Sequence, residues 1–174
     1  ADQATTINGL VDTQAGQLEA GGHVFIYDAG TFDEIGTLAI RVLSEPDASE
    51  SEAGLFDVIG GFVLEGLAPS SALELVYHAP GEAIDAEHAL VRRVRDGTRT
   101  AFALVDIGTL EGAKIRFNAA LETEPLPGTA QLGDYRILRL SAPWRLVSGT
   151  VVFGTADLED AWVVGQANDW PIVG

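Results

Sequence analysis

Cysteine is absent from the 174-residue chain. Its absence excludes disulfide bonds, thiolate metal sites and cysteine nucleophiles. Methionine is absent as well, so we expect that Ala1 follows either a removed initiator Met or a cleaved signal peptide. No apolar run approaches the roughly 18 to 20 residues that a membrane-spanning helix needs, so we expect no membrane span.

Positive charge is scarce too. Lys114 is the only lysine, and with nine arginines it leaves a formal net charge of −16, which argues against nucleic acid as a partner. Residues 1–90 hold sixteen acidic residues against Arg41 alone, whereas residues 91–174 hold ten acidic and nine basic residues. We interpret the excess of acidic residues in 1–90 first as a solvated acidic surface. The second interpretation is an acidic end that meets the basic patch of a neighbouring subunit.

The common catalytic signatures are missing from the sequence. No Gly-x-x-x-x-Gly-Lys loop precedes Lys114, and no Gly-x-Ser-x-Gly elbow surrounds Ser148. The three histidines, His23, His78 and His88, do not fall at metal-ligand spacing. No carboxylate pair of the kind that glycosidases use can be singled out among 26 acidic residues. We therefore expect no enzymatic activity, no catalytic residue and no cofactor.

Hydrophobic periodicity indicates β-structure almost throughout. Apolar and polar residues alternate along 37–43, 72–78 and 114–121, as in half-buried strands. Residues 5–11 form a lone β-prone run that could pair with an edge strand. Shorter strand-like runs occur at 23–27, 61–65, 100–106, 135–140, 149–153 and 161–165. Turn-forming residues separate the runs at a spacing typical of sandwiches and barrels.

One segment, 82–95, is a helical candidate. It carries acidic residues at its start and arginines at its end, which is the polarity that the helix dipole favours. A strand over 89–94 is the alternative. We therefore predict an all-β fold, a β-sandwich or barrel of about nine or ten strands with at most one short connecting helix.

The sequence contains an apparent internal repeat. Asp-x-Gly-Thr occurs at Asp28 and again at Asp106, and apolar alternation follows both copies. Such an echo is typical of a duplicated block, so we predict two tandem related β blocks. The first is an acidic N-terminal block, 1–95, with the possible connecting helix 82–95. The second is a near-neutral C-terminal block, 96–174, that ends in an apolar tail.

The segment from Asp28 to Glu34 resembles a cation loop at first sight. An EF-hand needs a bidentate Glu at its twelfth position, but the twelfth residue from Asp28 is Ala39. We therefore predict a hairpin connection here, and Asp28, Asp33 and Glu34 are weak calcium candidates as the alternative.

The C-terminal tail is the first candidate for an assembly contact. Trp170 precedes a proline and two aliphatic residues, and an apolar tail of this kind normally docks against a surface. The candidate interface residues are Trp170, Ile172, Val173, Ile7, Arg92 and Arg93.

Two functions fit these features. The first is a non-enzymatic structural protein, a β-rich subunit of a virion (capsid, decoration or tail) or of an extracellular filament. Its partners would be copies of itself or other subunits of the same assembly, met through strand-forming termini and edge strands. The alternative is a secreted carbohydrate- or calcium-binding β-sandwich module, which acidic loops and late tryptophans would suit. Residues 6–81, with INGLVDTQAG and FVLEGLAPSSALELVYHAPG, resemble the prealbumin-like modules appended to secreted enzymes; the resemblance covers less than half of the chain and transfers no functional residue.

Overall fold

The computed structural model describes residues 5–44, 51, 56–78, 87–96, 99–117, 132–140 and 172–173. Within these ranges the protein is all-β and contains no helix, so none of the described elements is a helix that could cross a membrane. The strands are β1 (Thr5–Val11), β2 (Gly16–Ala20), β3 (His23–Tyr27), β4 (Gly36–Val42), β5 (Phe56–Gly66), β6 (Glu74–His78), β7 (His88–Asp96), β8 (Arg99–Ile107), β9 (Thr109–Glu111), β10 (Lys114–Phe117), β11 (Gly133–Leu140) and β12 (Ile172–Val173).

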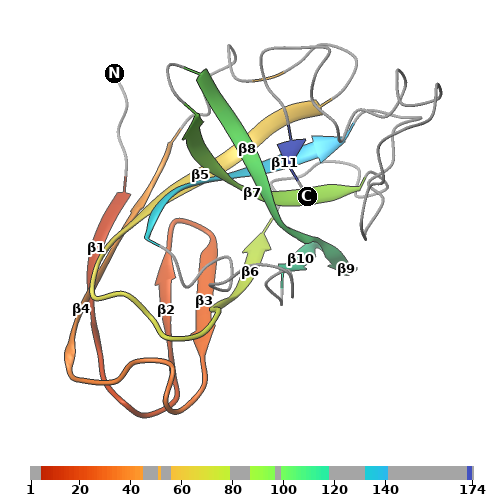
Figure 1. Ribbon diagram of the computed structural model, residues 1–174. Helices are drawn as coiled ribbons and strands as arrows, with labels where there is room; N and C mark the ends of the chain where they lie inside the picture. The colour runs from red at the N-terminus through yellow and green to blue at the C-terminus, as the bar shows by residue number, and fades with distance from the viewer. Residues whose placement is uncertain are drawn as a thin grey trace, which may run out of the picture.

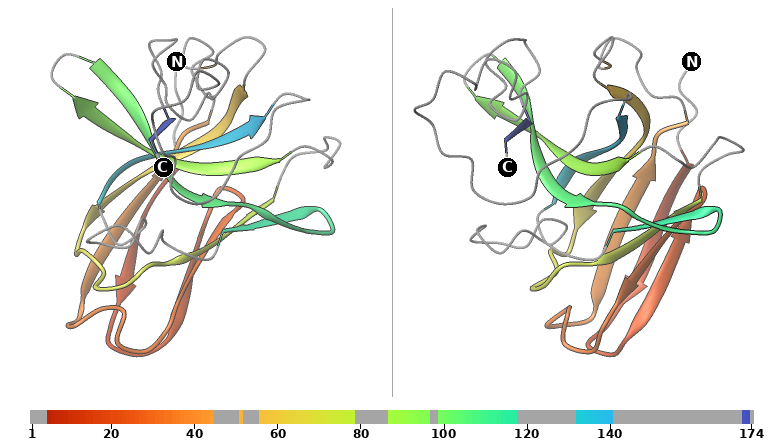
Figure 2. Two further views of the ribbon diagram at one scale, coloured as in Figure 1. Left: turned by 45° about the vertical axis from the view of Figure 1, so that its right-hand side comes forward. Right: turned by 90° about the vertical axis from the view of Figure 1, so that its right-hand side faces the viewer.

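The strands form two sheets in a sandwich-like arrangement (Figure 1). The seven-stranded sheet has the order β1-β4-β5-β11-β7-β8-β12, and the five-stranded sheet has the order β2-β3-β6-β10-β9. Neighbouring strands are antiparallel, except that β12 runs parallel to β8. β1 lies far from β7 and β8 in every view (Figure 2), so the two edges of the seven-stranded sheet are separate surfaces.

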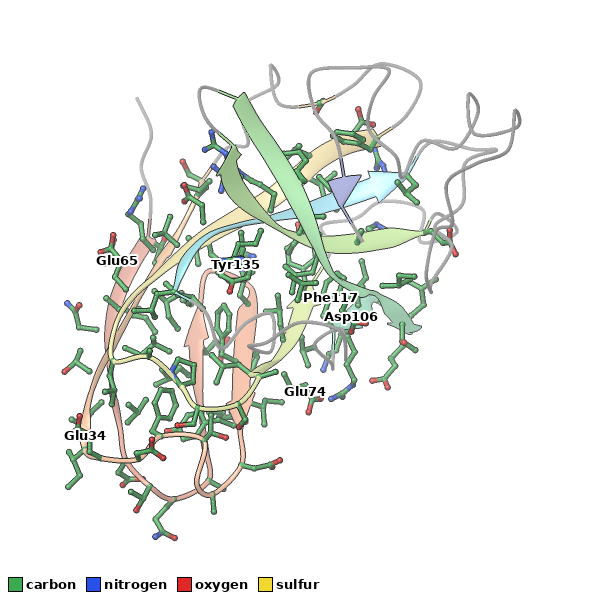
Figure 3. All side chains as sticks on the ribbon, in the orientation of Figure 1. Glu34, Glu65, Glu74, Asp106, Phe117 and Tyr135 are labelled. Carbon is green, nitrogen blue, oxygen red and sulfur yellow. The ribbon has the colours of Figure 1, made fainter. Side chains whose placement is uncertain are left out.

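The main core lies between the two sheets and is centred on aromatic rings. Phe62 of β5 stacks on Tyr135 of β11 and meets Phe25 of β3 edge-on, with both ring centroids 5.0 Å away. Each large side chain buried here stabilises the fold by roughly 1.5 to 3 kcal/mol. The core includes Phe25, Phe32, Leu38, Ile40, Phe62, Leu64, Leu75, Ile115, Phe117, Tyr135 and Ile137, all essentially inaccessible to solvent. Figure 3 shows Tyr135 and Phe117 inside the molecule.

A second apolar cluster covers the opposite face of the seven-stranded sheet. On β11, Ile137 belongs to the main core, whereas the next residue, Leu138, belongs to the second cluster, as the alternation of a strand requires. The second cluster comprises Phe56, Val58, Ala89, Val91, Phe102, Leu138 and Leu140. The central part of this sheet is therefore buried on both faces.

The helix predicted at 82–95 is wrong over its described part. Residues 88–96 form β7, which pairs with β11 on one side and β8 on the other, and the alternative strand over 89–94 is confirmed. Ala89 and Val91 face the second cluster while Leu90 faces the main core. Burial of these three consecutive residues removes the alternation of apolar and polar side chains that marks a half-buried strand.

The connection after β3 differs from the predicted hairpin. β3 and β4 belong to different sheets, so residues 28–35 carry the chain from one sheet to the other, and the hairpin prediction is wrong. Asp106 lies within β8, and Gly108 after it leads to β9 of the other sheet. Both Asp-x-Gly-Thr sequences thus stand where the chain changes sheets, in opposite directions.

The tandem repeat stays a prediction. Strands from residues 1–95 and from 96–174 occur in both sheets and contribute to the same core: they alternate as β5-β11-β7-β8 in the larger sheet and meet as β6-β10 in the smaller one. The predicted strands at 149–153 and 161–165 lie outside the described residues.

Candidate functional site

The four edge strands of the two sheets differ sharply in their protection. β12 has two residues, β9 has three and includes Glu111, and β2 has five and includes Glu19. β1 has seven residues, TTINGLV, with no charge and no proline. It also pairs with β4 over all seven residues without a register shift. Natural proteins guard edge strands by short length, charge, proline or bulges, and β1 has none of these devices.

One face of β1 is open to solvent. Thr6, Asn8 and Leu10 are exposed, and Leu10 keeps 73% of its surface accessible. Leu10 is one of only three large hydrophobic side chains that are exposed in the described ranges. On the opposite face, Ile7 packs against the main core. β1 is therefore fixed to the core through its inner face, while the side chains of its outer face are exposed to solvent.

The edge at β9 shows the opposite condition. Arg116 of β10 forms ion pairs with Glu74 of β6 and, at 3.1 Å, with Glu111 of β9. These charged side chains cover the strands near that edge of the five-stranded sheet. A neighbouring strand that paired with β9 would have to approach ionised groups, which is a cost that β1 does not impose.

The C-terminal tail lies at the far edge of the seven-stranded sheet (Figure 1). Ile172 pairs with Phe102, and Val173 pairs with Ala103, both on β8 of the same chain. Trp170 lies outside the described residues. Among the described residues, β12 thus pairs with two of the nine residues of β8.

The two candidate arginines lie in the same rows of the sheet as the tail. Arg93 of β7 stands opposite Phe102, and Arg92 stands opposite Ala103. Arg93 also approaches Asp134 of β11, with 3.7 Å between Nη1 and Oδ2. The structure thus brings four of the candidate interface residues to one edge of the sheet and places Ile7 at the other.

The calcium candidates do not converge. Ser70 Oγ donates a 2.7 Å hydrogen bond to Asp33 Oδ2, and Ser70 N donates to the carbonyl oxygen of Thr31. Asp33 therefore anchors the connection between sheets to the β5–β6 loop. Asp28 and Glu34 are exposed, and Figure 3 shows Glu34 at one end of the molecule. Within the described ranges, no group of three or more His, Asp or Glu side chains could hold a metal ion.

His23 is a core residue. Its ring lies among Phe25, Phe62 and Tyr77, with the Tyr77 ring centroid 5.0 Å away, and its Nδ1 is 2.9 Å from the carbonyl oxygen of Gly21. Burial lowers the pKa of His23 below its ordinary value, because an imidazolium would lose its hydration there. The ring is thus kept neutral and serves packing.

A groove beside Arg41 of β4 bears on the alternative function, which is the binding of carbohydrate or calcium. It has a volume of about 440 Å³, is widely open to solvent, and lies between β4, β5 and β11. Its lining includes Arg41, Val63, Glu65, Leu132 and Asp134, and no aromatic side chain is among the described residues that line it. Sugar-binding sites usually offer an aromatic platform, so this groove does not favour a carbohydrate ligand. Trp144, Trp162 and Trp170, on which the carbohydrate alternative depends, lie outside the described residues.

No family model, no curated protein and no solved structure matches the chain. The uncharged edge strand β1 is the feature of the described residues on which a functional proposal can rest. The sequence already indicated 5–11 as a strand able to pair at an edge. That this run forms an edge of the sheet, among the described residues, became visible only with the strand order.

Proposed function

We propose that the protein is a non-enzymatic structural subunit, of a virion or of an extracellular filament, that joins other copies through β1. The single observation that carries the proposal is a seven-residue edge strand without charge, proline or bulge and with an exposed outer face. The backbone N–H and C=O groups on the outer side of such a strand form a template for another strand.

The expected free energy of this contact determines which kind of assembly it can support. Each cross-strand residue pair contributes roughly 0.2 to 1 kcal/mol, so seven pairs contribute a few kcal/mol. A micromolar complex needs about 8 kcal/mol net, after association costs of roughly 4 to 15 kcal/mol. β1 alone therefore supports a weak contact. Such a contact suits an assembly of many copies, in which other contacts hold the subunits near one another.

A second contact is available at the opposite edge of the same sheet. There β12 pairs with Phe102 and Ala103 of β8, and Arg92 and Arg93 lie one strand further in. A subunit with one contact at each edge of a sheet can join two neighbours. That is the minimum requirement for a growing filament or shell.

The experiment places a lysine on the outer face of β1. Asn8→Lys should leave the protein folded and disfavour strand pairing, because a lysine on an exposed edge strand is a device by which natural proteins discourage the addition of another strand. Thr37→Lys is the matched control, since Thr37 is exposed on β4, one strand further in, and the change of net charge is the same. Sedimentation velocity and electron microscopy should show assemblies of full size for the wild type and Thr37→Lys, and smaller species for Asn8→Lys. Assemblies of wild-type size formed by Asn8→Lys would overturn the proposal.

A further inference from the structure

We propose that the strand that pairs with β1 is β1 of a second copy, running antiparallel about a two-fold axis at Asn8. This inference rests on the proposed function, because it names the partner at the same edge. The pairing would join the seven-stranded sheets of two copies into one continuous sheet.

The sequence of β1 is complementary to itself in this register. Asn8 faces Asn8 of the second copy, and Thr6 faces Leu10 on the exposed side of the strand. The exposed Leu10 is thereby covered by the methyl group of a β-branched residue, a favourable cross-strand pair. On the core side, Ile7 faces Gly9, so two large side chains never meet at the junction.

The neighbouring registers of the β1–β1 pair give less favourable cross-strand pairs. An axis at Ile7 would place two isoleucines opposite each other and leave Leu10 without a partner inside β1. An axis at Gly9 would bring Asp12 opposite Thr6 and so draw an acidic side chain toward the interface. The axis at Asn8 is the register that pairs all seven residues of the strand and includes no charge.

Charge also selects this edge for contact between identical copies. Each chain carries a net charge of −16, so most surfaces of two copies repel one another. The two outermost strands at this edge, residues 5–11 and 36–42, contain no acidic residue, and their single charge is the positive Arg41 opposite Thr6. Two copies of the acidic chain can therefore approach through β1 with little repulsion.

The absence of cysteine permits a direct test by crosslinking. Directly opposed residues of an antiparallel pair have Cα atoms roughly 4.5 to 5.5 Å apart, within the range of roughly 4.4 to 6.8 Å that a disulfide spans. Asn8→Cys should therefore form a disulfide-linked dimer under mild oxidation. Thr6→Cys alone and Leu10→Cys alone should not crosslink, whereas a mixture of these two variants, one with a size tag, should give the mixed dimer. Thr37→Cys, exposed on β4, is the control for random collisions.

The outcomes separate this inference from the proposed function. If Asn8→Cys and the mixture crosslink and Thr37→Cys does not, the two-fold pairing is established. Crosslinking of Thr6→Cys or Leu10→Cys alone would overturn the register. If Asn8→Cys fails to crosslink while Asn8→Lys still blocks assembly, the two-fold inference falls and β1 pairs with another strand. If Asn8→Cys fails and Asn8→Lys assembles normally, both proposals fall. Melting curves of each variant verify that it is folded.

Discussion

Leu18 of β2 packs directly over Gly9 of β1: a Cβ atom placed on Gly9 would lie 2.5 Å from Leu18 Cδ1. The contact joins an edge strand of one sheet to an edge strand of the other. β1 is thus held on its inner face by β2 as well as by its pairing with β4. An edge that is fixed before binding loses less conformational entropy when a partner strand pairs with it.

The first prediction concerns this contact. Gly9→Ala should lower the free energy of unfolding by about 1 kcal/mol, because the methyl groups of Leu18 must move to admit the new side chain. Leu18→Ala in the same chain should remove the overlap, so the two changes should not add. Urea unfolding of both single variants and the double variant measures the effect. If the losses of unfolding free energy in the two single variants added up to the loss in the double variant, the side chain at position 9 and Leu18 would not interfere.

The second prediction concerns Gly66 at the end of β5. Its φ is +98°, and an added Cβ would lie 2.5 Å from the backbone oxygen of Thr37, which cannot turn aside. Gly66→Ala should therefore cost roughly 2 kcal/mol or more. Gly133 is the matched control, since its φ is also positive, +138°, but a Cβ there would meet no atom within 4 Å. Gly133→Ala should show only the cost of the positive φ. Equal losses of unfolding free energy in the two variants would contradict the role assigned to Thr37.

The third prediction concerns pH. The pKa of His23 is lowered from 6.5, first of all by burial. The folded state therefore binds fewer protons than the unfolded state as soon as the pH falls below this ordinary value. Stability contributed by the neutral ring is complete above pH 6.5 and is lost as the pH falls toward the folded-state pKa. His23→Phe should flatten the loss of unfolding free energy between about pH 7 and pH 5.

The control for this prediction is the wild-type protein, whose pH dependence contains the general titration of the acidic surface. Thermal melts at a series of pH values compare it with His23→Phe. A His23→Phe protein with the same slope as the wild type would show that the ring is protonated without penalty.

The fourth prediction concerns calcium. Because Asp33 is engaged by Ser70 and the carboxylates of Asp28 and Glu34 do not join it in a cluster, calcium should change the melting temperature by no more than a degree or two. The measurement compares calcium with EDTA. A rise of about 5 °C, on the order of 1 kcal/mol for a domain of this size, would reveal a site that these side chains form on binding.

Local sequence patterns predicted much of the fold, and the failures have physical causes. The alternation along 37–43 identified β4 to within a residue at each end, because that strand is buried on one face only. β9 was missed because its three residues are all exposed and carry no apolar periodicity. The helix is predicted at 82–95 because its acidic start and arginine-rich end match the polarity of a helix dipole, and this charge pattern carries no information about the pairing of β7 with β11 and β8.

Prediction of the candidate site from the sequence is limited in a different way. The run 5–11 is recognisable as a strand from its sequence, which also makes Ile7 a candidate interface residue. Whether that strand is an edge depends on its pairing with β4 and on what lies beyond it, which are contacts between segments distant in sequence. The same holds for the arginines of β7, whose proximity to the tail follows from the pairing of β7 with β8 and of β8 with β12. Periodicity within one segment carries no information about such neighbours.

The last prediction separates the two edges of the seven-stranded sheet. Deleting residues 168–174 removes Trp170, which can bury on the order of 200 Å², together with β12. If the tail supplies the second contact, the truncated Asn8→Cys protein should still form the disulfide dimer but no larger assembly. A lower melting temperature of the isolated subunit would instead mean that the tail serves its own sheet, where it pairs with β8.

Salt provides an independent measurement of the same distinction. Pairing through the uncharged β1 should strengthen as ionic strength rises, because salt screens the repulsion between two chains of charge −16. A contact in which Arg92 and Arg93 meet the acidic surface of a neighbour should weaken under the same conditions. Light scattering of the full-length protein should therefore show large assemblies giving way to dimers as salt is added. Assemblies of full size formed by the truncated protein at both low and high salt would refute the role of the tail, because β1 contacts about a two-fold axis close after two copies.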